Sequence, residues 1–416
     1  MDVIVDRCAG LDVHKKSVMA TVRSPNGVGG RDQRTREFAT FTGRLVELRD
    51  WLVAEGVSQV AMEATGVYWK PVWHVLEDAP TLQLLLVNPA HFKNLPGRKT
   101  DVKDSEWLAQ LLECGLLRGS FIPPANIAKL RDLTRYRTKI VGERVRETQR
   151  IQKLLEDAGI KLDSVASDVL GVSCRRMLEA LIAGERDPDV LADMALTRMR
   201  PKIGVLREAL VGRFDDHHAV LLGLHLAHVD ELDAIEARLD IEVNKLMAPF
   251  ADAATRLLSI PGVGKRVAEV IVAEIGTDMS RFPTDKHLAS WVGLCPGHHE
   301  SAGKRRSGKA RKGNPALRSA LCEAAWAATH GKDNYLAAQF RRFKRRFGTK
   351  GDTKAIFAVA HTMIVIVWHI LASNDATYDE LGADFFERRT DTEARKRQLV
   401  RQLEALGTKV TLEPAA

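Results

Sequence analysis

Cysteine pairs, a leader segment and long apolar runs are all scarce in this sequence. The five cysteines are scattered, with no Cys-x-x-Cys pair and no zinc-type histidine spacing. This pattern argues against a disulfide framework or a zinc site and is typical of a reducing cytoplasm. No basic segment followed by an apolar run opens the chain, so no signal peptide is expected. The one membrane-like stretch, 354–372, is interrupted by His361, Thr362 and His369 and is expected to be a buried helix, with no membrane partner.

Acidic residues are fewer than basic ones. The chain has 54 Asp and Glu against 62 Lys and Arg, a net charge of +8 and a pI near 9.2. An excess of this sign favours a polyanionic partner. With 45% hydrophobic and 28% charged residues over 416 positions, the chain is expected to be globular and to form two to four domains.

Residues 1–120 are expected to form an α/β domain. Helical spacing is clearest in 42–56, where Leu45, Leu48, Trp51 and Leu52 share one face. Two strands joined by a polar turn at 14–16 are predicted in 9–24, and further strands are predicted in 36–40, 58–65 and 82–89. Further helices are predicted in 68–79 and from 101 onwards. Three strands followed by alternating helices and strands is the order of an RNase H-like fold, although periodicity by itself supports only the α/β class.

Residues 121–250 change to long, highly charged helices. The first helix has an intermittent apolar stripe, and apolar residues of the second recur at steps of three and four, which predicts coiled-coil packing within the chain or between chains. The apolar residues are Leu130, Leu133, Ile140, Ile151 and Leu154 in the first helix and Val229, Leu232, Ile235, Leu239, Val243 and Leu246 in the second. The first helix is also densely basic, as phosphate contacts require, and Arg131, Arg135 and Lys139 are candidates to bind nucleic acid. For any single arginine, a solvated helix face is the simpler explanation.

Residues 251–345 are expected to form a helical domain, followed by C-terminal helices and a tail at 346–416. The PGVG turn within 257–276 is that of a helix-hairpin-helix, in which backbone N–H groups hold a phosphate without reading sequence. Gly262, Gly264 and Lys265 are its candidate contacts. An ordinary helix turn explains the glycines equally well.

A basic segment rich in Gly and Ser lies between 293 and 321. It predicts a flexible cationic loop before a helix that starts near Pro315. Its candidate phosphate contacts are Lys304, Arg305, Arg306, Lys309, Arg311 and Lys312. Further on, 341–350 combines six basic side chains with Phe343 and Phe347. These two rings, four residues apart, are expected to anchor a charged helix in the core, and its opposite face could contact the backbone of nucleic acid at the same time.

Four carboxylates are candidate metal ligands, and for the two in core strands a charge is costly unless it is paired or bound to a metal. Asp12 lies within the first strand, Glu63 within a later strand, and Asp101 and Asp104 are three apart at the start of a helix. The last two are also well placed to cap that helix. Oxygen ligands of this kind suit Mg²⁺, and a pair of such ions can clamp the attacking and leaving oxygens of a phosphoryl transfer.

The segments GLDVHKK, MEATGVYW and KTDVKDSEWLA together resemble the RuvC-like DEDD domain of the transposases of insertion-sequence family 110, which are related to the pilin-gene invertase. By that resemblance Asp12, Glu63, Asp101 and Asp104 are the four metal-binding catalytic acids. The family's second domain contains a serine nucleophile, which matches Ser301 here. The flank differs, with Ser301-Ala302-Gly303 where the family often has Ser-Gly-Gly, so Ser307 is a lesser candidate.

The resemblance implies a bacterial transposase or site-specific recombinase in which Ser301 attacks a DNA phosphate next to the metal-bound acids. It also implies donor and target DNA as partners, a noncoding guide RNA, a dimer or tetramer, and a cytoplasmic, nucleoid-associated location. Two alternatives remain open on the residues alone. A junction-resolving nuclease would use the same acids with water as nucleophile, and a non-catalytic nucleic-acid-binding protein would use the basic helices without the acids.

Overall fold

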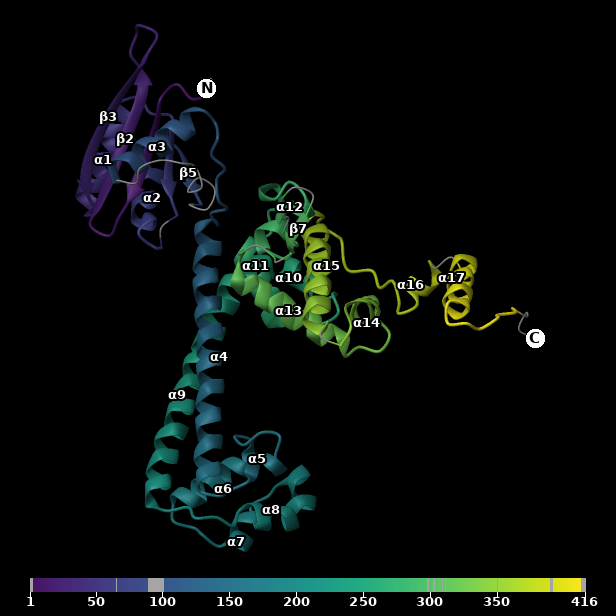
Figure 1. Cartoon of the computed structure of the whole chain (residues 1–416). Coiled ribbons are helices and arrows are strands. Elements are labelled where there is room, and N and C mark those ends of the chain that lie inside the picture. The colour runs from purple at the N-terminus through teal and green to yellow at the C-terminus, as the bar shows by residue number, and fades with distance from the viewer. Residues whose placement is uncertain are drawn as a thin grey trace. The chain divides into compact units, whose positions relative to one another are not determined.

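The computed structural model of the chain divides into two compact units, Met1–Ile122 and Pro123–Ala416 (Figure 1). The structure describes residues 3–64, 66–88, 101–297, 299–301, 304–308, 310, 312–349, 351–389 and 392–412. For 101–103, 299–301, 304–307, 392, 394 and 395 it describes the backbone only.

The first unit contains one mixed five-stranded sheet in the order β3-β2-β1-β4-β5. β2 pairs antiparallel with β1 and β3, and β4 pairs parallel with β1 and β5. The strands are β1 (Cys8–Val13), β2 (Ser17–Pro25), β3 (Arg31–Ala39), β4 (Gln59–Glu63) and β5 (Gln83–Val87), and the helices are α1 (Thr42–Ala54), α2 (Trp69–Glu77) and α3 (Asp101–Glu113). The predicted α/β class is confirmed, and β3 is longer than expected.

Helices cover both faces of this sheet, and β1 is therefore buried along its whole length. Ala9, Leu11 and Val13 of β1 pack in the core that contains the buried faces of α1 and α2. Cys8 packs in a second core with apolar residues of α3. Since side chains alternate along a strand, Gly10 and Asp12 share the face that α3 covers.

The second unit begins with a hairpin of two long helices, α4 (Ala125–Asp157) and α9 (Asp216–Met247), which lie side by side (Figure 1). Ile140, Leu232 and Leu239 pack together between them, with Leu133 and Ile235 partly buried alongside, as the spacing predicts. Four short helices with their own apolar core join the two: α5 (Leu162–Val165), α6 (Val172–Ile182), α7 (Pro188–Asp193) and α8 (Ile203–Ala209).

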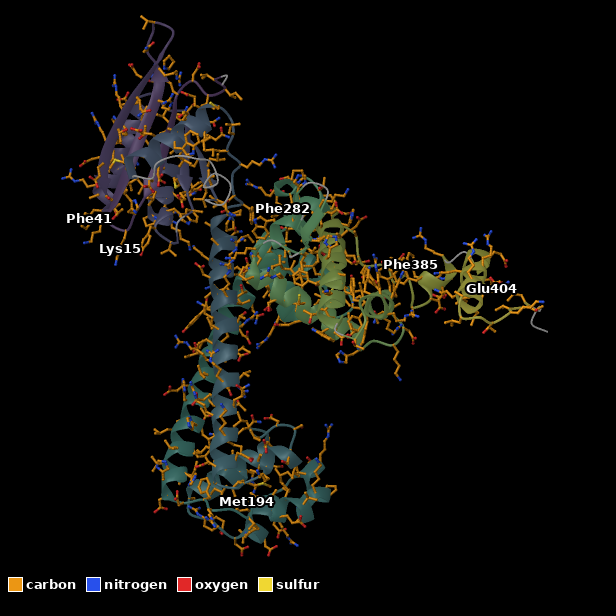
Figure 2. All side chains as sticks on the ribbon, in the orientation of Figure 1. Lys15, Phe41, Met194, Phe282, Phe385 and Glu404 are labelled. Carbon is orange, nitrogen blue, oxygen red and sulfur yellow. The ribbon has the colours of Figure 1, made fainter. Side chains whose placement is uncertain are left out.

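A group of helices completes the unit. They are α10 (Ala251–Leu257), α11 (Lys265–Ile275), α12 (Asp285–Val292), α13 (Pro315–Thr329), α14 (Tyr335–Phe347) and α15 (Asp352–Ala372), followed by α16 (Phe385–Arg388) and α17 (Thr392–Glu404). α15 is the one described helix that is long and apolar enough to cross a membrane. It packs against α10, α12, α13 and α14, and its Trp368 indole N–H donates to the carbonyl of Phe282 at 2.9 Å (Phe282 is labelled in Figure 2). The expected buried helix is thus found.

The segment expected to be a flexible loop contains a short antiparallel hairpin instead. β6 (His299–Ser301) pairs with β7 (Lys304–Ser307), with a register shift between His299 and Glu300. Backbone hydrogen bonds of this ladder orient the segment, which a count of Gly, Ser and basic residues does not reveal. The predicted helix start near Pro315 is confirmed, and Asn314 caps α13 by accepting from the N–H of Leu317 at 3.1 Å.

Candidate active site

α3 lies directly on the sheet at Gly10. A Cβ atom at Gly10 would overlap the Ser105 carbonyl and the Ala109 backbone nitrogen, so any larger residue would push the helix away. Two residues earlier on the same face of β1, the Cys8 thiol is 3.4 Å from the Ala109 carbonyl. A glycine inside a strand is the sequence sign of such a close approach, but the sequence does not say which element approaches.

Buried hydroxyls hold the first half of α3 in register with the sheet. Ser105 Oγ lies 2.8 Å from Thr21 Oγ1 on β2, which lies 2.9 Å from Thr35 Oγ1 on β3. Thr21 is directly opposite Gly10 in the β1–β2 ladder. The Ser105 and Thr21 hydroxyls therefore lie beside Gly10, where there is no side chain. Their contact sets the position of Asp104, the residue before Ser105. Gly10, Thr21 and Ser105 were not predicted from the sequence as residues of the site.

A buried ion pair holds the other end of α3. Glu113, with a side chain 4% exposed, binds Arg23 of β2 at 3.0 Å and accepts from Arg31 Nε of β3 at 2.7 Å. The backbone carbonyl of Glu113 also accepts from the N–H groups of Ile4 and Val5. α3 is thus fixed at both ends, and its N-terminal end is held where β1 reaches Asp12.

Three of the predicted acids lie at one edge of the sheet. β1 and β4 are parallel, and Leu11 pairs with Met62, so Asp12 and Glu63 follow at the same level. Ala61 belongs to the core on the α3 side, which by alternation puts Glu63 on the same face as Asp12. Both carboxylates are in residues 8% exposed. Asp104 is half-buried, and the side chain of Asp101, the first residue of α3, lies outside the described part.

The acids influence one another electrostatically. Burial raises the pKa of the Asp12 carboxyl above its ordinary value, and the charges of Asp104 and Glu63 act in the same direction. His14 opposes this, with its Nε2 3.1 Å from Asp12 Oδ2. A carboxyl that is buried beside two other carboxylates is destabilised as an anion, and a nearby cation would relieve that cost.

The donor set suits a hard divalent cation, because it consists of carboxylate oxygens, two from the ends of parallel strands and two from α3. Among the side chains that the structure describes, no group of three or more His, Cys, Asp or Glu residues is placed to hold a metal ion. Asp12, Glu63 and Asp104 therefore do not form such a group by themselves. The side chain of Asp101 lies outside the described part, so the set of four remains a prediction.

The candidate nucleophiles lie at opposite ends of the β6–β7 hairpin. Ser301 is the last residue of β6 and pairs with Lys304, the first residue of β7. Ser307 is the last residue of β7 and pairs with His299. Lys304, Arg305 and Arg306 belong to β7, Lys312 is exposed beyond it, and Lys309 and Arg311 lie outside the described residues.

Two of the candidate nucleic-acid contacts on α4 are engaged within the protein. The carboxylate of Glu274, at the end of α11, is fully buried and accepts from Arg135 at 2.6 and 2.8 Å. Arg131 lies 3.3 Å from the same carboxylate and donates to the carbonyl of Ala273. We therefore assign Arg131 and Arg135 to packing of α4 against α11. Lys139 is exposed, as a phosphate contact requires.

The PGVG turn joins α10 to α11, and its two glycines have different surroundings. Gly262 has a left-handed φ of 85°, and a Cβ there would overlap the backbone of Ala324 on α13. Its role is therefore a turn packed against α13. Gly264 is open to solvent, caps α11 without a side-chain hydrogen bond, and is followed by exposed Lys265.

Comparison with known proteins places both units in one group. A family model described as a transposase, DEDD type of IS110, matches residues 9–160, and one described as transposase IS116/IS110/IS902 family matches 254–341. The chain is 28% identical over 315 residues to y4rJ, a transposase by name, of Sinorhizobium fredii, covering 71% of this chain and 72% of that protein. It is 36% identical over 125 residues to the pilin gene-inverting protein of Moraxella bovis, covering 29% and 37%.

A third relative is the transposase for insertion sequence element IS1111A of Coxiella burnetii, 24% identical over 326 residues, with 77% of this chain and 79% of the relative covered. The matched regions include the acids of the first unit and the turn and hairpin of the second. The chain belongs to the IS110/IS116 family of insertion-sequence transposases, which are enzymes that cut and rejoin DNA.

Proposed function

We propose that this transposase is a Mg²⁺-dependent recombinase in which four carboxylates bind the metal and one serine attacks a DNA phosphate. The observation that carries the proposal is that Asp12 and Glu63 follow paired residues on neighbouring parallel strands. Burial raises the pKa of Asp12, and the charges of Asp104 on α3 and of Glu63 act in the same direction. The strand order and directions of this sheet support an RNase H-like unit.

Asp12, Glu63, Asp101 and Asp104 would hold the metal. When bound, Mg²⁺ supplies positive charge to the phosphate oxygens that become more negative during transfer. The chain's own part is to keep the acids in place: Gly10 allows α3 to approach, the Thr21–Ser105 contact sets its register, and His14 orients Asp12.

Ser301 is the proposed nucleophile. Its Oγ forms a bond to phosphorus as the bond from phosphorus to a deoxyribose oxygen breaks; the serine loses its proton and the leaving oxygen gains one. Attack by the free deoxyribose end of the second DNA on the phosphoserine link reverses these bond changes and joins the strands. The basic side chains on β7 and Lys312 would stabilise the charge on the phosphate.

Phosphate contacts elsewhere are proposed for exposed Lys139 and Lys265 and for the backbone N–H groups after Gly264, as in a helix-hairpin-helix. The family resemblance supports a noncoding guide RNA as a further partner and a dimer or tetramer as the working assembly, because two DNA partners are cut and exchanged.

The acids are tested by replacing each of Asp12, Glu63, Asp101 and Asp104 with Ala. We expect loss of DNA cleavage with retained folding, measured by strand cleavage with Mg²⁺ and by circular dichroism. Glu106→Ala, on the same helix, is a matched control that should keep activity. A variant of any of the four acids that cleaves at the original rate would remove that residue from the metal site.

The serine separates a recombinase from a water-using nuclease. Ser301→Ala should still bind DNA and Mg²⁺ but give neither recombinant product nor a protein–DNA adduct that resists denaturant, whereas Ser307→Ala should be milder. A nicked suicide DNA traps the adduct, and peptide mass locates it. An adduct at Ser307, or full activity in Ser301→Ala, would show that the nucleophile is misassigned.

A further inference from the structure

α14 ends in a strongly basic surface that includes the rings of Phe343 and Phe347. The helix has five Lys and Arg residues and no acidic residue in its 13 positions. Lys344 pairs with Asp352 at 3.1 Å, and the Arg342 guanidinium lies over the ring of Phe386 at 4.8 Å. Arg341, Arg345 and Arg346 are exposed and make no ion pair with any residue that the structure describes. Three unpaired cations within six positions favour an anionic partner.

The aromatic part of this surface differs from the sequence-based expectation. Phe343 is half-buried, but Phe347 is 39% exposed rather than anchored in the core. The two rings are stacked, with centroids 5.9 Å apart and an angle of 11° between their planes. Gly348, with a φ of 76°, ends the helix directly after Phe347. Phe347 is therefore the outer ring of a two-ring stack.

We propose that this surface, Arg341 to Phe347, binds a single-stranded segment of nucleic acid. An unpaired base extends the Phe343–Phe347 stack by one ring, and Arg341, Arg345 and Arg346 neutralise the adjoining phosphates. Stacking on aromatic side chains combined with a basic surface is the general chemistry of single-strand binding, whereas the bases of a duplex are already stacked on one another. A protein partner would match the apolar ring but would leave three desolvated arginines to be paired.

Binding of short labelled DNA and RNA single strands and of a matched duplex to the full chain tests the proposal by fluorescence anisotropy. EDTA is present throughout, so the outcome does not depend on the proposed metal site or on Ser301. Phe347→Ala should weaken single-strand binding about fivefold to tenfold, and the duplex should be nearly unaffected. Phe347→Ala should lose more affinity for one of the two single strands, DNA or RNA, and that strand is the natural ligand of this surface.

The salt dependence of binding distinguishes the contribution of the Phe347 ring from that of the arginines. Phe347→Ala should leave the slope of log K against log salt unchanged, because no phosphate contact is lost, whereas Arg345→Ala should lower it by about 0.7. A strand with abasic sites should bind Phe347→Ala and the unmodified protein equally.

Phe41→Ala, at a ring 79% exposed in the first unit (Figure 2), is the matched control and should leave single-strand affinity unchanged.

Two further variants keep the test independent of folding. Phe347→Trp retains a ring face and should bind as the unmodified protein does, whereas Phe347→Leu retains only apolar volume and should bind as weakly as Phe347→Ala. The proposal would be overturned if Phe347→Leu bound single strands with full affinity, or if Phe347→Ala lost as much affinity for the duplex as for single strands. It would also be overturned if Phe347→Ala changed the molecular mass measured by light scattering and left single-strand affinity unchanged.

Discussion

Gly10 is the residue whose lack of a side chain allows α3 to lie directly on β1. Gly10→Ala should destabilise the first unit by about 1–3 kcal/mol, because the new Cβ overlaps backbone atoms of α3 that cannot move alone. It should also reduce DNA cleavage, since α3 carries two of the acids. The midpoint of urea unfolding measures the first effect.

Gly43 provides the matched control for that change. A Cβ at Gly43, in the first turn of α1, has nothing within 4 Å, and Gly43→Ala is expected to be neutral or slightly stabilising. If the two alanine variants unfolded at the same urea concentration, the close approach of α3 to β1 would be contradicted.

Cys8 makes the stability of the first unit sensitive to alkaline pH. Burial, aided by the charge of Glu113, raises the pKa of the thiol from 9.0 to about 12. The folded state thus keeps a proton that the unfolded state loses near pH 9, and this contribution to stability is complete below pH 9 and is lost as the pH rises towards 12. Cys8→Ala should flatten the decline in unfolding free energy between pH 9 and 11, relative to the unmodified protein; parallel curves would assign the decline to other groups.

At the scale of elements, Glu274 joins three helices. It lies at the end of α11, binds Arg135 of α4, and accepts from the side-chain N–H of Asn314, the cap of α13, at 2.6 Å. Glu274→Ala would remove a fully buried carboxylate that binds both Arg131 and Arg135, and we expect a loss of about 3–5 kcal/mol in unfolding free energy.

An exposed ion pair is the control for Glu274. Glu179 pairs with Arg175 one turn away on α6, with a side chain 55% exposed, and Glu179→Ala should cost less than about 1 kcal/mol in urea unfolding. Equal losses in the two variants would mean that burial of the Glu274 cluster contributes nothing.

At the scale of the whole molecule, the net charge of +8 predicts salt-sensitive binding of nucleic acid. Each neutralised phosphate contributes about 0.7 to 0.9 to the slope of log K against log salt. Lys139→Gln, Lys265→Gln and Lys312→Gln should each lower that slope, as titrations at several salt concentrations would show. Lys202→Gln should lower it less, because the Lys202 ammonium already donates to the Val165 carbonyl at 2.7 Å. An affinity that stays constant from low to physiological salt would mean that these cations are only a solvated surface.

Much of this organisation was predictable because periodicity is a local property. Leu45, Leu48, Trp51 and Leu52 were predicted as one helical face, and all four are buried. The hairpin at 299–307 was not predicted, because its strands are three and four residues long and lack alternating apolar residues. Arg131 and Arg135 were predicted as nucleic-acid contacts, and their pairing with Glu274 was not foreseen, because that residue lies about 140 positions away in the sequence.

The sequence by itself determined the order of strands and helices, the family, and which residue types are available for metal binding and phosphate attack. Only the tertiary structure decided which of these groups meet. α3 approaches Asp12 because Gly10 leaves room and Ser105 finds Thr21, and these residues are far apart along the chain. Likewise, the fold pairs Arg131 and Arg135 with the buried carboxylate of Glu274, whereas Phe347 lies on the surface. Local pattern specifies backbone conformation, but burial and pairing depend on which distant surfaces pack together, and that is a property of the whole fold.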